Sequence, residues 1–540
     1  MKNRSINRVI GMLVASATIW FTAQAGAEVK LPSVFSDHMV LQRDMAVPIW
    51  GTAAPGEKVT VKFRNQEETV TAGADGKWLV KLKPLVAGGP DTLVVNTVTI
   101  ADVLVGEVWV GSGQSNMQIG VGYFIKGDAG LALMVTNAPY PKLRLSSANK
   151  PWVEATAPNA SNFSALLFAF GVRLQAELGV PVGLLVGAVG GTPSGYWVTK
   201  EMLAADPACQ ALVAKAEAAS PFAARQEKYE QDLAKYKVAL AAWEKEVAAA
   251  SNQALQATEP MAAPAKAKLP TKPVIPFAPI RAGDASGAVG HLYDTYIKPF
   301  QPYAIRGVLW DQGESNTALN GIDQYTTMGA LISGWRQAWG VGEFPFIYIQ
   351  KPSGDGCAWD KGNPVTKFAE TFTPLPAQVP DDGQTVELFT KILTYPNTAM
   401  AISSDLGSGL HPANKSGYGH RAADVALGLV YDKKIEYYGP LYASHTIDGD
   451  KVCISYTHIG QGLAFKPADK PQGFAIAGDD KQFHWADAVI EGNTVVLTCA
   501  AVAKPVYVRY AWSNTRRWAN LFNKDGLPAL PFRLEEGSEK

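Results

Sequence analysis

Cysteine is scarce in this chain: only four of its 540 residues are cysteines, and they are spread from residue 209 to residue 499. Four cysteines are too few for the dense disulfide framework of a small secreted domain. None of them forms a C-x-x-C pair, and no H-E-x-x-H motif occurs, so the sequence predicts no metal site and no cofactor.

A surplus of charge of either sign is also absent, because the chain has 49 basic and 49 acidic residues. Proteins that bind nucleic acid or an anionic membrane surface concentrate positive charge, so neither partner is predicted. A neutral chain is more compatible with a sugar ligand. After the first 28 residues, no run is long and apolar enough to cross a bilayer, which takes about 20 residues.

The first 27 residues have the pattern of a secretory signal peptide. Lys2, Arg4 and Arg8 precede an apolar run over residues 9–21, and small residues at 23–27 offer cleavage sites. An uncleaved membrane anchor is the alternative, but the run is short for a span. The sequence therefore predicts an exported protein, periplasmic or secreted, that has no membrane attachment after cleavage.

Export to an oxidising compartment permits disulfide bonds. Cys453 and Cys499 both lie in strand-like runs of the C-terminal region, whereas Cys209 and Cys357 lie in unrelated contexts. We therefore predict one disulfide bond, between Cys453 and Cys499.

The pattern of apolar runs divides the rest of the chain into three domains. Residues 28–102 and 439–540 alternate short β-rich runs with turn residues, which is typical of small all-β domains. Residues 103–438 alternate strand-like runs with helical segments, which predicts an α/β domain whose parallel sheet is covered by helices on both faces. Strands are expected at 107–110, 182–186, 305–310, 346–349 and 400–403, and helices at 166–178 and 415–431.

A helical insertion at 200–273 interrupts the α/β domain. Six of its apolar residues recur at spacings of four, three, four, three and four, which puts them on one face of a helix. These residues are Tyr229, Leu233, Tyr236, Leu240, Trp243 and Val247. Residues 208–219 are expected to pack against that face as an intramolecular hairpin, in preference to a coiled-coil dimer. Residues 257–276, rich in Ala, Pro and Lys, are expected to return as an extended linker.

The most informative motif is G-S-G-Q-S-N-M at residues 111–117. It follows the apolar run Val108-Trp109-Val110, and so places Ser115 in a tight turn at the carboxyl end of a predicted strand. Open α/β sheets carry their reactive side chains at such ends. Met117 stands where a G-x-S-x-G motif has its second glycine, which weakens an ordinary α/β-hydrolase interpretation.

Two further polar clusters follow predicted strands. One is W-D-Q-G-E-S-N at residues 310–316, and the other is H-P-A-N-K at residues 411–415. Acyl transfer needs a nucleophile, a base and donors for the developing oxyanion. Ser115 supplies the first and His411 the second, and the amides of Gln312 and Asn316 are candidates for the third.

Together with L-P-S-V-F-S-D-H-M-V-L-Q-R-D at 31–44 and G-A-V-G-G-T-P-S-G-Y-W at 187–197, these motifs resemble the SGNH hydrolase superfamily. The resemblance is to its carbohydrate acetylesterase branch, which includes the sialate O-acetylesterases, and it covers residues 31 to 432. It implies a three-layer α/β catalytic domain with Ser115 as nucleophile and His411 as base. The oxyanion donors that it implies are the backbone amides of Ser115 and of Gly190 or Gly191, and a side-chain amide of Gln312 or Asn316.

The chain departs from this pattern beside His411. The superfamily usually has an aspartate three residues before the histidine, and this chain has Ser408 there. The imidazole is then oriented either by a carboxylate elsewhere, of which Asp405 is the nearest upstream, or by a main-chain carbonyl. Glu314 is expected to lie behind the site as a buried partner. A glutamate that is common in the branch is replaced by Gly195.

These observations predict a secreted serine esterase that removes O-acetyl groups from sialic acid or another carbohydrate through an acyl-enzyme. An acetylxylan- or pectin-type acetylesterase is the first alternative, and a non-catalytic carbohydrate-binding protein is the second. Gln114, Trp197 and Trp359 are expected to contact the sugar. The sequence leaves open which glycan is the substrate and how many copies of the chain assemble.

Overall fold

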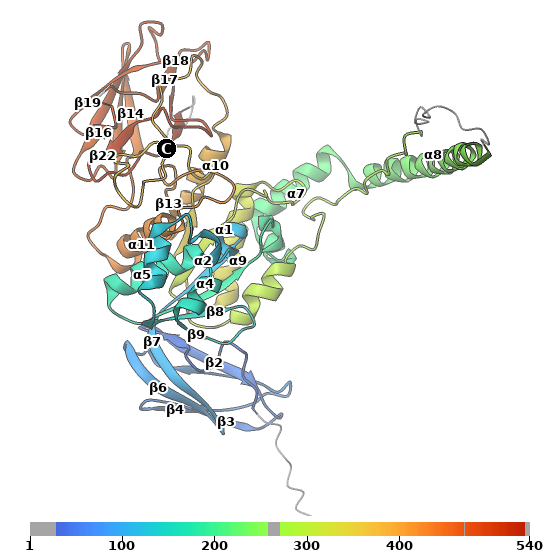
Figure 1. Ribbon diagram of the computed structural model, residues 1–540, viewed down its shortest axis with the longest axis vertical. Helices are drawn as coiled ribbons and strands as arrows, with labels where there is room; N and C mark the ends of the chain where they lie inside the picture. The colour runs from blue at the N-terminus through green and yellow to red at the C-terminus, as the bar shows by residue number, and fades with distance from the viewer. Residues whose placement is uncertain (1–28, 257–269, 469, 535–540) are drawn as a thin grey trace, which may run out of the picture.

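The computed structural model describes residues 29–256, 270–468 and 470–534. The predicted signal peptide, 1–27, lies outside these residues, as does most of the predicted linker. Figure 1 shows a central α/β body with a β-rich unit at each end and one long helix that projects sideways. None of the described helices is long and apolar enough to cross a membrane.

The central sheet has six neighbouring parallel strands in the order β13-β12-β11-β7-β10-β8. Their bounds are β7 (Val98–Gly113), β8 (Tyr140–Ser147), β10 (Val182–Ala188), β11 (Gly307–Asp311), β12 (Phe346–Ile349) and β13 (Thr398–Ala401). All five strands predicted for this region are found, although the predicted strand 400–403 shares only residues 400 and 401 with β13. The prediction of a parallel sheet holds only for these six strands, because β9 (Val153–Ala155) is antiparallel to β8 and N-terminal strands extend the sheet beyond β7.

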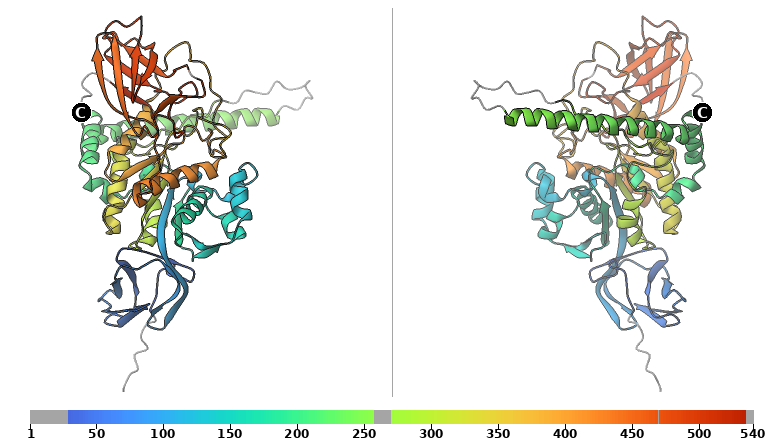
Figure 2. Two further views of the ribbon diagram at one scale, coloured as in Figure 1. Left: turned by 90° about the vertical axis from the view of Figure 1, so that its left-hand side faces the viewer. Right: turned by 90° about the vertical axis from the view of Figure 1, so that its right-hand side faces the viewer.

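Helices cover both faces of this sheet, as Figure 2 shows in side view. On one face, α5 (Ala165–Leu178) packs beside α11 (Lys415–Tyr431), and Phe170 of α5 contacts Trp109 of β7. On the other face, Trp335 of α9 (Gln324–Trp339) packs edge-on against Trp310 of β11. The two predicted helices are confirmed. Shorter helices are α2 (Val121–Phe124), α3 (Ala129–Thr136), α4 (Ala157–Asn162) and α10 (Gln384–Lys391).

Strand β7 also carries the N-terminal β unit. Strands β1 and β6 pair with β7, β3 pairs with β4 and β6, and β2 pairs with β5. The bounds are β1 (Val40–Gln42), β2 (Val47–Thr52), β3 (Lys58–Phe63), β4 (Gln66–Thr71), β5 (Lys77–Leu82) and β6 (Gly88–Val95). One hydrophobic core runs through both units. The boundary predicted between residues 102 and 103 therefore falls inside a continuous strand.

The C-terminal β unit has a hydrophobic core of its own. One sheet has the order β14-β15-β20-β19 and another β18-β17-β21-β23, while β16 pairs with β22. The bounds are β14 (Leu441–Asp448), β15 (Lys451–Thr457), β16 (Leu463–Phe465), β17 (Phe474–Ala477), β18 (His484–Trp485), β19 (Asp487–Glu491), β20 (Thr494–Thr498), β21 (Tyr507–Tyr510), β22 (Leu521–Asn523) and β23 (Phe532–Leu534).

The predicted disulfide bond is wrong, because Cys453 and Cys499 are both free thiols. Strands β15 and β20 are neighbours, as the prediction required. Their register, however, sets Cys453 opposite Val496, and Cys499 lies beyond the end of β20. An offset of three residues along a strand is about 10 Å, too far for an S–S bond.

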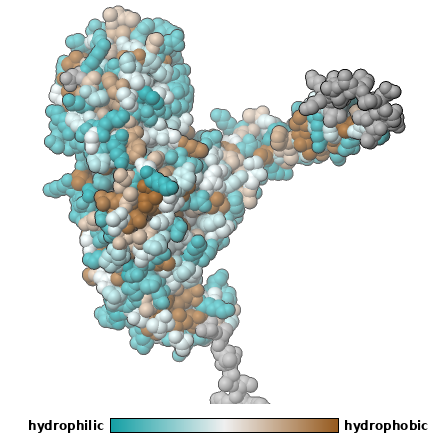
Figure 3. Space-filling model, in the orientation of Figure 1, coloured by the Kyte–Doolittle hydropathy of each residue, from teal (hydrophilic) through white to brown (hydrophobic). Residues whose placement is uncertain are grey.

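The insertion contains α6 (Lys200–Ala205), α7 (Pro207–Ala219) and α8 (Phe222–Gln256). The predicted hairpin is wrong: α7 packs against α9 of the body, and α8 projects away from it (Figure 1). With 35 residues, α8 is about 52 Å long and extends far beyond α7. Its predicted apolar face is covered in part by the returning chain, since Trp243 Nε1 donates to the Pro270 carbonyl at 2.7 Å. Figure 3 shows hydrophobic side chains still exposed along this arm.

The arm formed by α8 lies outside the sheet edges where the polar motifs meet. Replacing residues 229–272 by a short Gly/Ser linker is therefore expected to keep hydrolysis of a small acetate ester within about twofold of the intact protein. Initial rates and a melting curve would check this. A folded deletion protein without activity would show that the arm contributes to the site. A second deletion, of residues 208–257, also removes most of α7 with its buried Cys209. Because it removes core contacts, we expect this protein to melt at a lower temperature than the 229–272 deletion.

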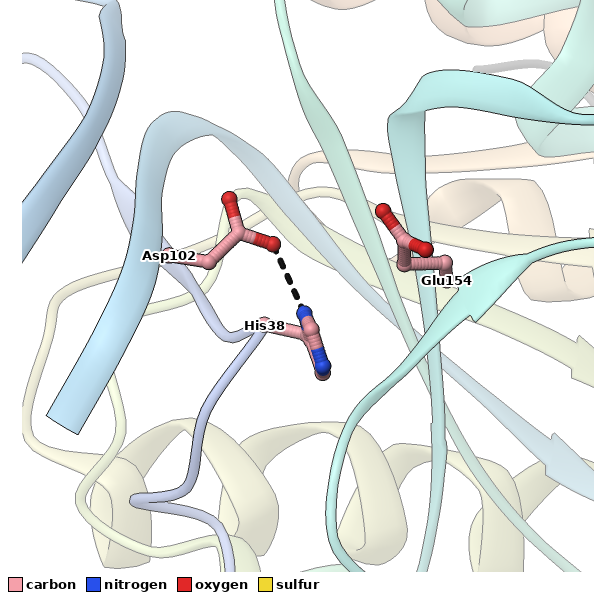
Figure 4. Close-up of side chains that lie close together, drawn as sticks. All are labelled: His38, Asp102 and Glu154. Carbon is pink, nitrogen blue, oxygen red and sulfur yellow. Dashed lines mark hydrogen bonds and ion pairs between the residues drawn. The ribbon is translucent and has the colours of Figure 1, made fainter.

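A cluster of charged side chains joins the N-terminal unit to β8 and β9 (Figure 4). His38 Nδ1 lies 2.7 Å from Asp102 Oδ2, and buried Arg144 places Nη2 at 2.9 Å from the same oxygen and 3.7 Å from Glu154 Oε1. His38, Asp102 and Glu154 offer three ligand atoms within 4.8 Å of one another. Because Arg144 already supplies a positive charge to both carboxylates, we interpret the group as an ion-pair cluster. Asp102 also lies eleven residues before the end of β7, about 36 Å from the polar motifs.

Candidate active site

Ser115 lies where the sequence predicts, in the turn at the carboxyl end of β7. The turn approaches β11 so closely that a Cβ on Gly113 would lie 2.1 Å from the Asp311 carbonyl oxygen. Gly113 also has a φ of 128°, which disfavours any residue with a side chain. Helix α1 (Ser115–Gln118) begins at once and leaves the Ser115 side chain partly exposed.

His411 contacts Ser115: its Nε2 lies 2.9 Å from Ser115 Oγ. The histidine comes from the loop between β13 and α11, and amide side chains hold this loop in place. Asn116 Nδ2 donates to the Leu410 carbonyl at 3.0 Å, and Asn414 Nδ2 donates to the Leu406 carbonyl at 3.0 Å. With a proton on Nδ1, the ring presents Nε2 as an acceptor for the serine proton.

A network of charges lies behind the serine, in which Lys351 and Asp311 are buried and Glu314 is exposed. Lys351 Nζ lies 2.6 Å from Asp311 Oδ1 and 2.5 Å from Glu314 Oε1. Glu314 in turn accepts hydrogen bonds from Asn116 at 3.1 Å and from Gln114. Glu314 thus ties the turn to β11 and β12, but it is an exposed residue of the loop after β11 and not the buried partner that the sequence predicts.

The charge states of this network follow from its contacts. Burial works to raise the pKa of Glu314, but the neighbouring Lys351 ammonium outweighs it and the pKa is lowered. Burial likewise works to lower the pKa of Lys351, and Asp311 and Glu314 together raise it instead. Lys351 is therefore a cation and Glu314 an anion at neutral pH.

Lys415, the last residue of the H-P-A-N-K motif, is a second buried cation. Its Nζ donates to Asn116 Oδ1 at 2.6 Å and lies 5.1 Å from the centre of the Phe124 ring. Burial lowers the pKa of Lys415 to about 8. Because an ammonium only donates, it fixes the Asn116 amide with Nδ2 towards Leu410 and Glu314. Sequence reasoning missed Lys351, which has no motif, and passed over Lys415.

The loop after β10 lies against the nucleophile. A Cβ on Gly190 would come within 3.2 Å of Ser115 Cβ, and the Gly190 amide donates to Gln118 Oε1 at 2.8 Å. Gly191 is exposed beside it. Gly190 and Gly191 therefore lie where the resemblance implies, with the Gly190 amide occupied by a side chain that is itself exposed.

The two candidate side-chain donors differ in their environments. Gln312 is fully buried, and its Nε2 donates to the carbonyls of Asn316 at 3.0 Å and Thr192 at 3.4 Å. Its amide is therefore used to join two loops and is not presented to a substrate. Asn316 is exposed, and its side chain makes no hydrogen bond to any described residue. Of the two, only Asn316 has an available amide.

Two of the three predicted sugar contacts are wrong. Trp197 is fully buried between Trp310 and Tyr296, and its Nε1 donates to Thr192 Oγ1. Gln114 is also buried, with its amide bound to Glu314 and Ser315. Both residues support the turns that carry the site, so neither is accessible to a ligand. Trp359 is half-buried against Phe522 of the C-terminal unit.

Asp405 does not contact His411. It is fully buried, and Arg421 binds both of its carboxylate oxygens, at 3.1 and 2.9 Å. Ser408, three residues before His411, donates instead to Glu370 Oε1 at 2.6 Å. Glu370 comes from the long loop after β12, where neither a motif nor a periodicity marks it, so sequence reasoning missed it.

Asp405→Asn is expected to lower the free energy of unfolding by about 2 kcal/mol, because a buried Arg421 loses a charged partner. The folded variant should keep kcat within about tenfold, because the His411 ring is not touched. Denaturant unfolding and kcat, measured well below the melting temperature, check the two parts. A loss of 100-fold or more in folded protein would mean that Asp405 orients the ring after all.

Comparison with known proteins finds relatives among the acetylesterases. No family model matches the chain. The chain is 27% identical to a sialate O-acetylesterase of Rattus norvegicus, over 97% of this chain and 98% of the relative. It is 26% identical to a sialate O-acetylesterase of Homo sapiens, over 96% of this chain and 95% of the relative. A crystal structure of a carbohydrate acetylesterase from Xanthomonas citri superposes with a TM-score of 0.68 at 28% identity, covering 94% of this chain and all of that one.

These similarities extend over nearly the whole chain in sequence and in structure. They confirm the prediction of a sialate O-acetylesterase-like protein and of a carboxylic ester hydrolase. They also agree with the mixed α/β architecture and its additional small β sheets.

Proposed function

We propose that the protein is an exported serine esterase that removes O-acetyl groups from sialic acid or another acetylated carbohydrate, with Ser115 as nucleophile and His411 as base. The observation that carries the proposal is the hydrogen bond between His411 Nε2 and Ser115 Oγ, 2.9 Å long, at the carboxyl end of β7. A nucleophile and a base in direct contact at such an edge are what acyl transfer requires. The acetylesterase relatives support the same reaction.

The reaction follows from the placement of these groups. His411 Nε2 takes the Ser115 proton while Oγ bonds to the acetyl carbon, and the carbonyl oxygen becomes an oxyanion. The amides of Ser115 and of Gly190 or Gly191 are the proposed donors to that oxyanion, with Asn316 as the side-chain donor. The protonated His411 gives its proton to the sugar oxygen as the bond from that oxygen to the acetyl carbon breaks, which releases the sugar with a free hydroxyl. A water molecule, deprotonated by the same ring, then attacks the acyl-enzyme and releases acetate.

Catalysis is proposed to take place in an SGNH-type domain at residues 103–438, flanked by β domains at 28–102 and 439–540. Removal of the signal peptide, 1–27, would leave the enzyme periplasmic or secreted. N-terminal sequencing of protein recovered from the periplasm or the medium tests this, and a mature chain that begins near Gly26 or Glu28 is expected. A full-length chain held in the membrane would contradict it.

Acetate release from a panel of esters tests the function. The panel contains O-acetylated sialic acid, acetylated xylan, acetylated pectin and a chromogenic acetate ester. Activity on the first is expected, in line with the sialate O-acetylesterase relatives. Activity confined to xylan or pectin would favour an acetylxylan- or pectin-type acetylesterase. Similarity to the carbohydrate acetylesterase from Xanthomonas citri is compatible with that alternative. No release from any ester would leave the carbohydrate-binding alternative.

A further inference from the structure

Three hydrogen bonds between described residues join the turn that carries Ser115 to the segment that carries His411. The first is the contact of these two residues with each other. The other two are made by Asn116: its Nδ2 donates to the Leu410 carbonyl at 3.0 Å, and its Oδ1 accepts from Lys415 Nζ at 2.6 Å. Asn116 directly follows the nucleophile, and Leu410 directly precedes the base. The placement of the nucleophile against the base therefore depends on this one amide.

The orientation of the Asn116 amide is determined by all of its partners together. Its Nδ2 donates to the Leu410 carbonyl and, at 3.1 Å, to Glu314 Oε1. Rotation of the amide by half a turn would direct Oδ1 at these two acceptors and Nδ2 at the Lys415 ammonium, which only donates. Each contact would then join two groups of the same kind. The charged form of Lys415 thus keeps Asn116 donating to the backbone beside the base.

Lys415 lies in an environment that is unfavourable for a charge. Its side chain is fully buried, and among the described residues its one hydrogen bond is to Asn116 and no carboxylate forms an ion pair with it. Its Nζ lies 5.1 and 5.3 Å from the ring centres of Phe124 and Tyr418. Lys415 is also the first residue of α11, where the helix dipole disfavours a cation. A buried cation normally has a carboxylate partner, so stability alone does not account for a lysine here.

Four charged groups act on Lys415 from the elements around it. Three are carboxylates that favour the ammonium and one is an ammonium that opposes it: Asp311, Glu314 and Asp128, and Lys351. Burial is the largest effect and lowers the pKa of Lys415 to about 8. The side chain is therefore mostly charged at neutral pH and becomes neutral as the pH rises through that value. A neutral amine has a lone pair that accepts hydrogen bonds, so it no longer fixes the amide that it contacts.

We propose that Lys415 is a positioning residue of the active site that acts through Asn116, an inference that rests on the esterase function proposed above. Its ammonium keeps Asn116 donating to the Leu410 carbonyl, and this bond fixes the backbone next to the base. Lys415 takes no proton from the reaction and touches no reacting atom. A displacement of about 1 Å between reacting groups costs up to about 100-fold in rate, so loss of the charge should lower kcat and leave KM almost unchanged.

Lys415→Met tests the proposal, because methionine fills the space of the lysine stem and removes the charge. We expect kcat for a chromogenic acetate, measured well below the melting temperature, to fall at least about 30-fold, with KM within about threefold. In the wild type, kcat should fall as the pH rises through about 8, the pKa of Lys415. In Lys415→Met, kcat should be independent of pH from about 7.5 to about 9.5. A lysine that only stabilised the fold would not set that alkaline limb.

Asn116→Ala removes the group through which Lys415 is proposed to act. We expect a loss of kcat at least as large and no further loss when Lys415→Met is added, because effects that pass through one contact are not additive. Should Lys415→Met fail to fold, Asn116→Ala tests the same loss of kcat and of the alkaline limb. Lys433→Met is the matched control. This exposed lysine donates to the Glu177 carbonyl at 3.3 Å, and its loss should leave kcat and the pH profile within about twofold of the wild type.

Any of four results would overturn the inference while the wild-type enzyme is active. Two concern Lys415→Met: a kcat within about threefold of the wild type, or an alkaline limb that persists. The others are a wild-type kcat that stays flat to about pH 9.5, or a further loss of kcat in the double variant. An inactive wild-type protein would instead contradict the proposed esterase itself, so the two failures are distinguishable.

Discussion

Ser115→Ala is expected to lower kcat for acetate esters by at least about 10⁴-fold. The hydroxyl oxygen is the atom that bonds to the acetyl carbon, so no acyl-enzyme forms without it. The melting temperature should stay almost unchanged, because the side chain is partly exposed and its one hydrogen bond is to His411. Acetate release under single-turnover conditions and a thermal melt measure the two quantities.

Ser112→Ala is the matched control for this variant. Ser112 lies three residues earlier on β7, is fully buried, and its hydroxyl makes no hydrogen bond to any described residue. Removing such a hydroxyl costs little, so activity within about threefold of the wild type is expected. Turnover by Ser115→Ala within tenfold of the wild type would rule out Ser115 as the nucleophile.

Lys351→Met is expected to lower the free energy of unfolding by about 3–5 kcal/mol. The substitution leaves Asp311 and Glu314 without the cation that both contact, and an unpaired buried charge is costly. Activity should fall as well, because Glu314 holds Gln114 and Asn116 on either side of Ser115. Denaturant unfolding at neutral pH measures the loss of stability.

The stabilisation by this network should depend on pH in a defined way. In the folded chain the pKa of Glu314 lies below its ordinary value of 4.5. The stabilisation that Glu314 contributes is therefore fully present above pH 4.5 and is lost as the pH falls through the folded pKa. In the folded chain the pKa of Lys351 lies above its ordinary value of 10.5. The stabilisation that Lys351 contributes is therefore fully present below pH 10.5 and is lost as the pH rises through the folded pKa. The difference in stability between wild type and Lys351→Met should therefore be largest between about pH 5 and 10.

Lys62→Met is the control for Lys351→Met. Lys62 pairs with Glu67 at 3.1 Å on the surface, where both side chains are more than half exposed. An exposed pair of this kind contributes less than about 1 kcal/mol. A Lys351→Met protein no less stable than this control would mean that the network does not stabilise the fold.

The sequence was sufficient for the parts of the fold that follow from local pattern. Strand β12 coincides with its predicted bounds because it is a short apolar run between breaks in the pattern. Helix α11 also coincides, and Asn414 of the histidine motif caps it. Ser115 and His411 were predicted to meet because both follow parallel strands of one sheet, whose carboxyl ends lie at one edge.

The remaining errors concern contacts that local pattern does not determine. Trp197 follows a loop-like motif, yet its ring lies in the core, because burial depends on Trp310 and α9. Cys453 and Cys499 lie on neighbouring strands, but the register between strands is set by the whole sheet. Lys351 and Glu370 enter the site region from loops, and only the three-dimensional arrangement brings them there.

The central claim is that Ser115, activated by His411, is the acetyl acceptor. Labelling with a serine-directed phosphonate, followed by peptide mass mapping and residual activity, tests it most directly. We expect one label per chain, on Ser115 and not on Ser112, with activity lost in proportion to labelling and no labelling in a His411→Ala protein. A label on another residue, or full activity in a chain labelled at Ser115, would contradict the claim.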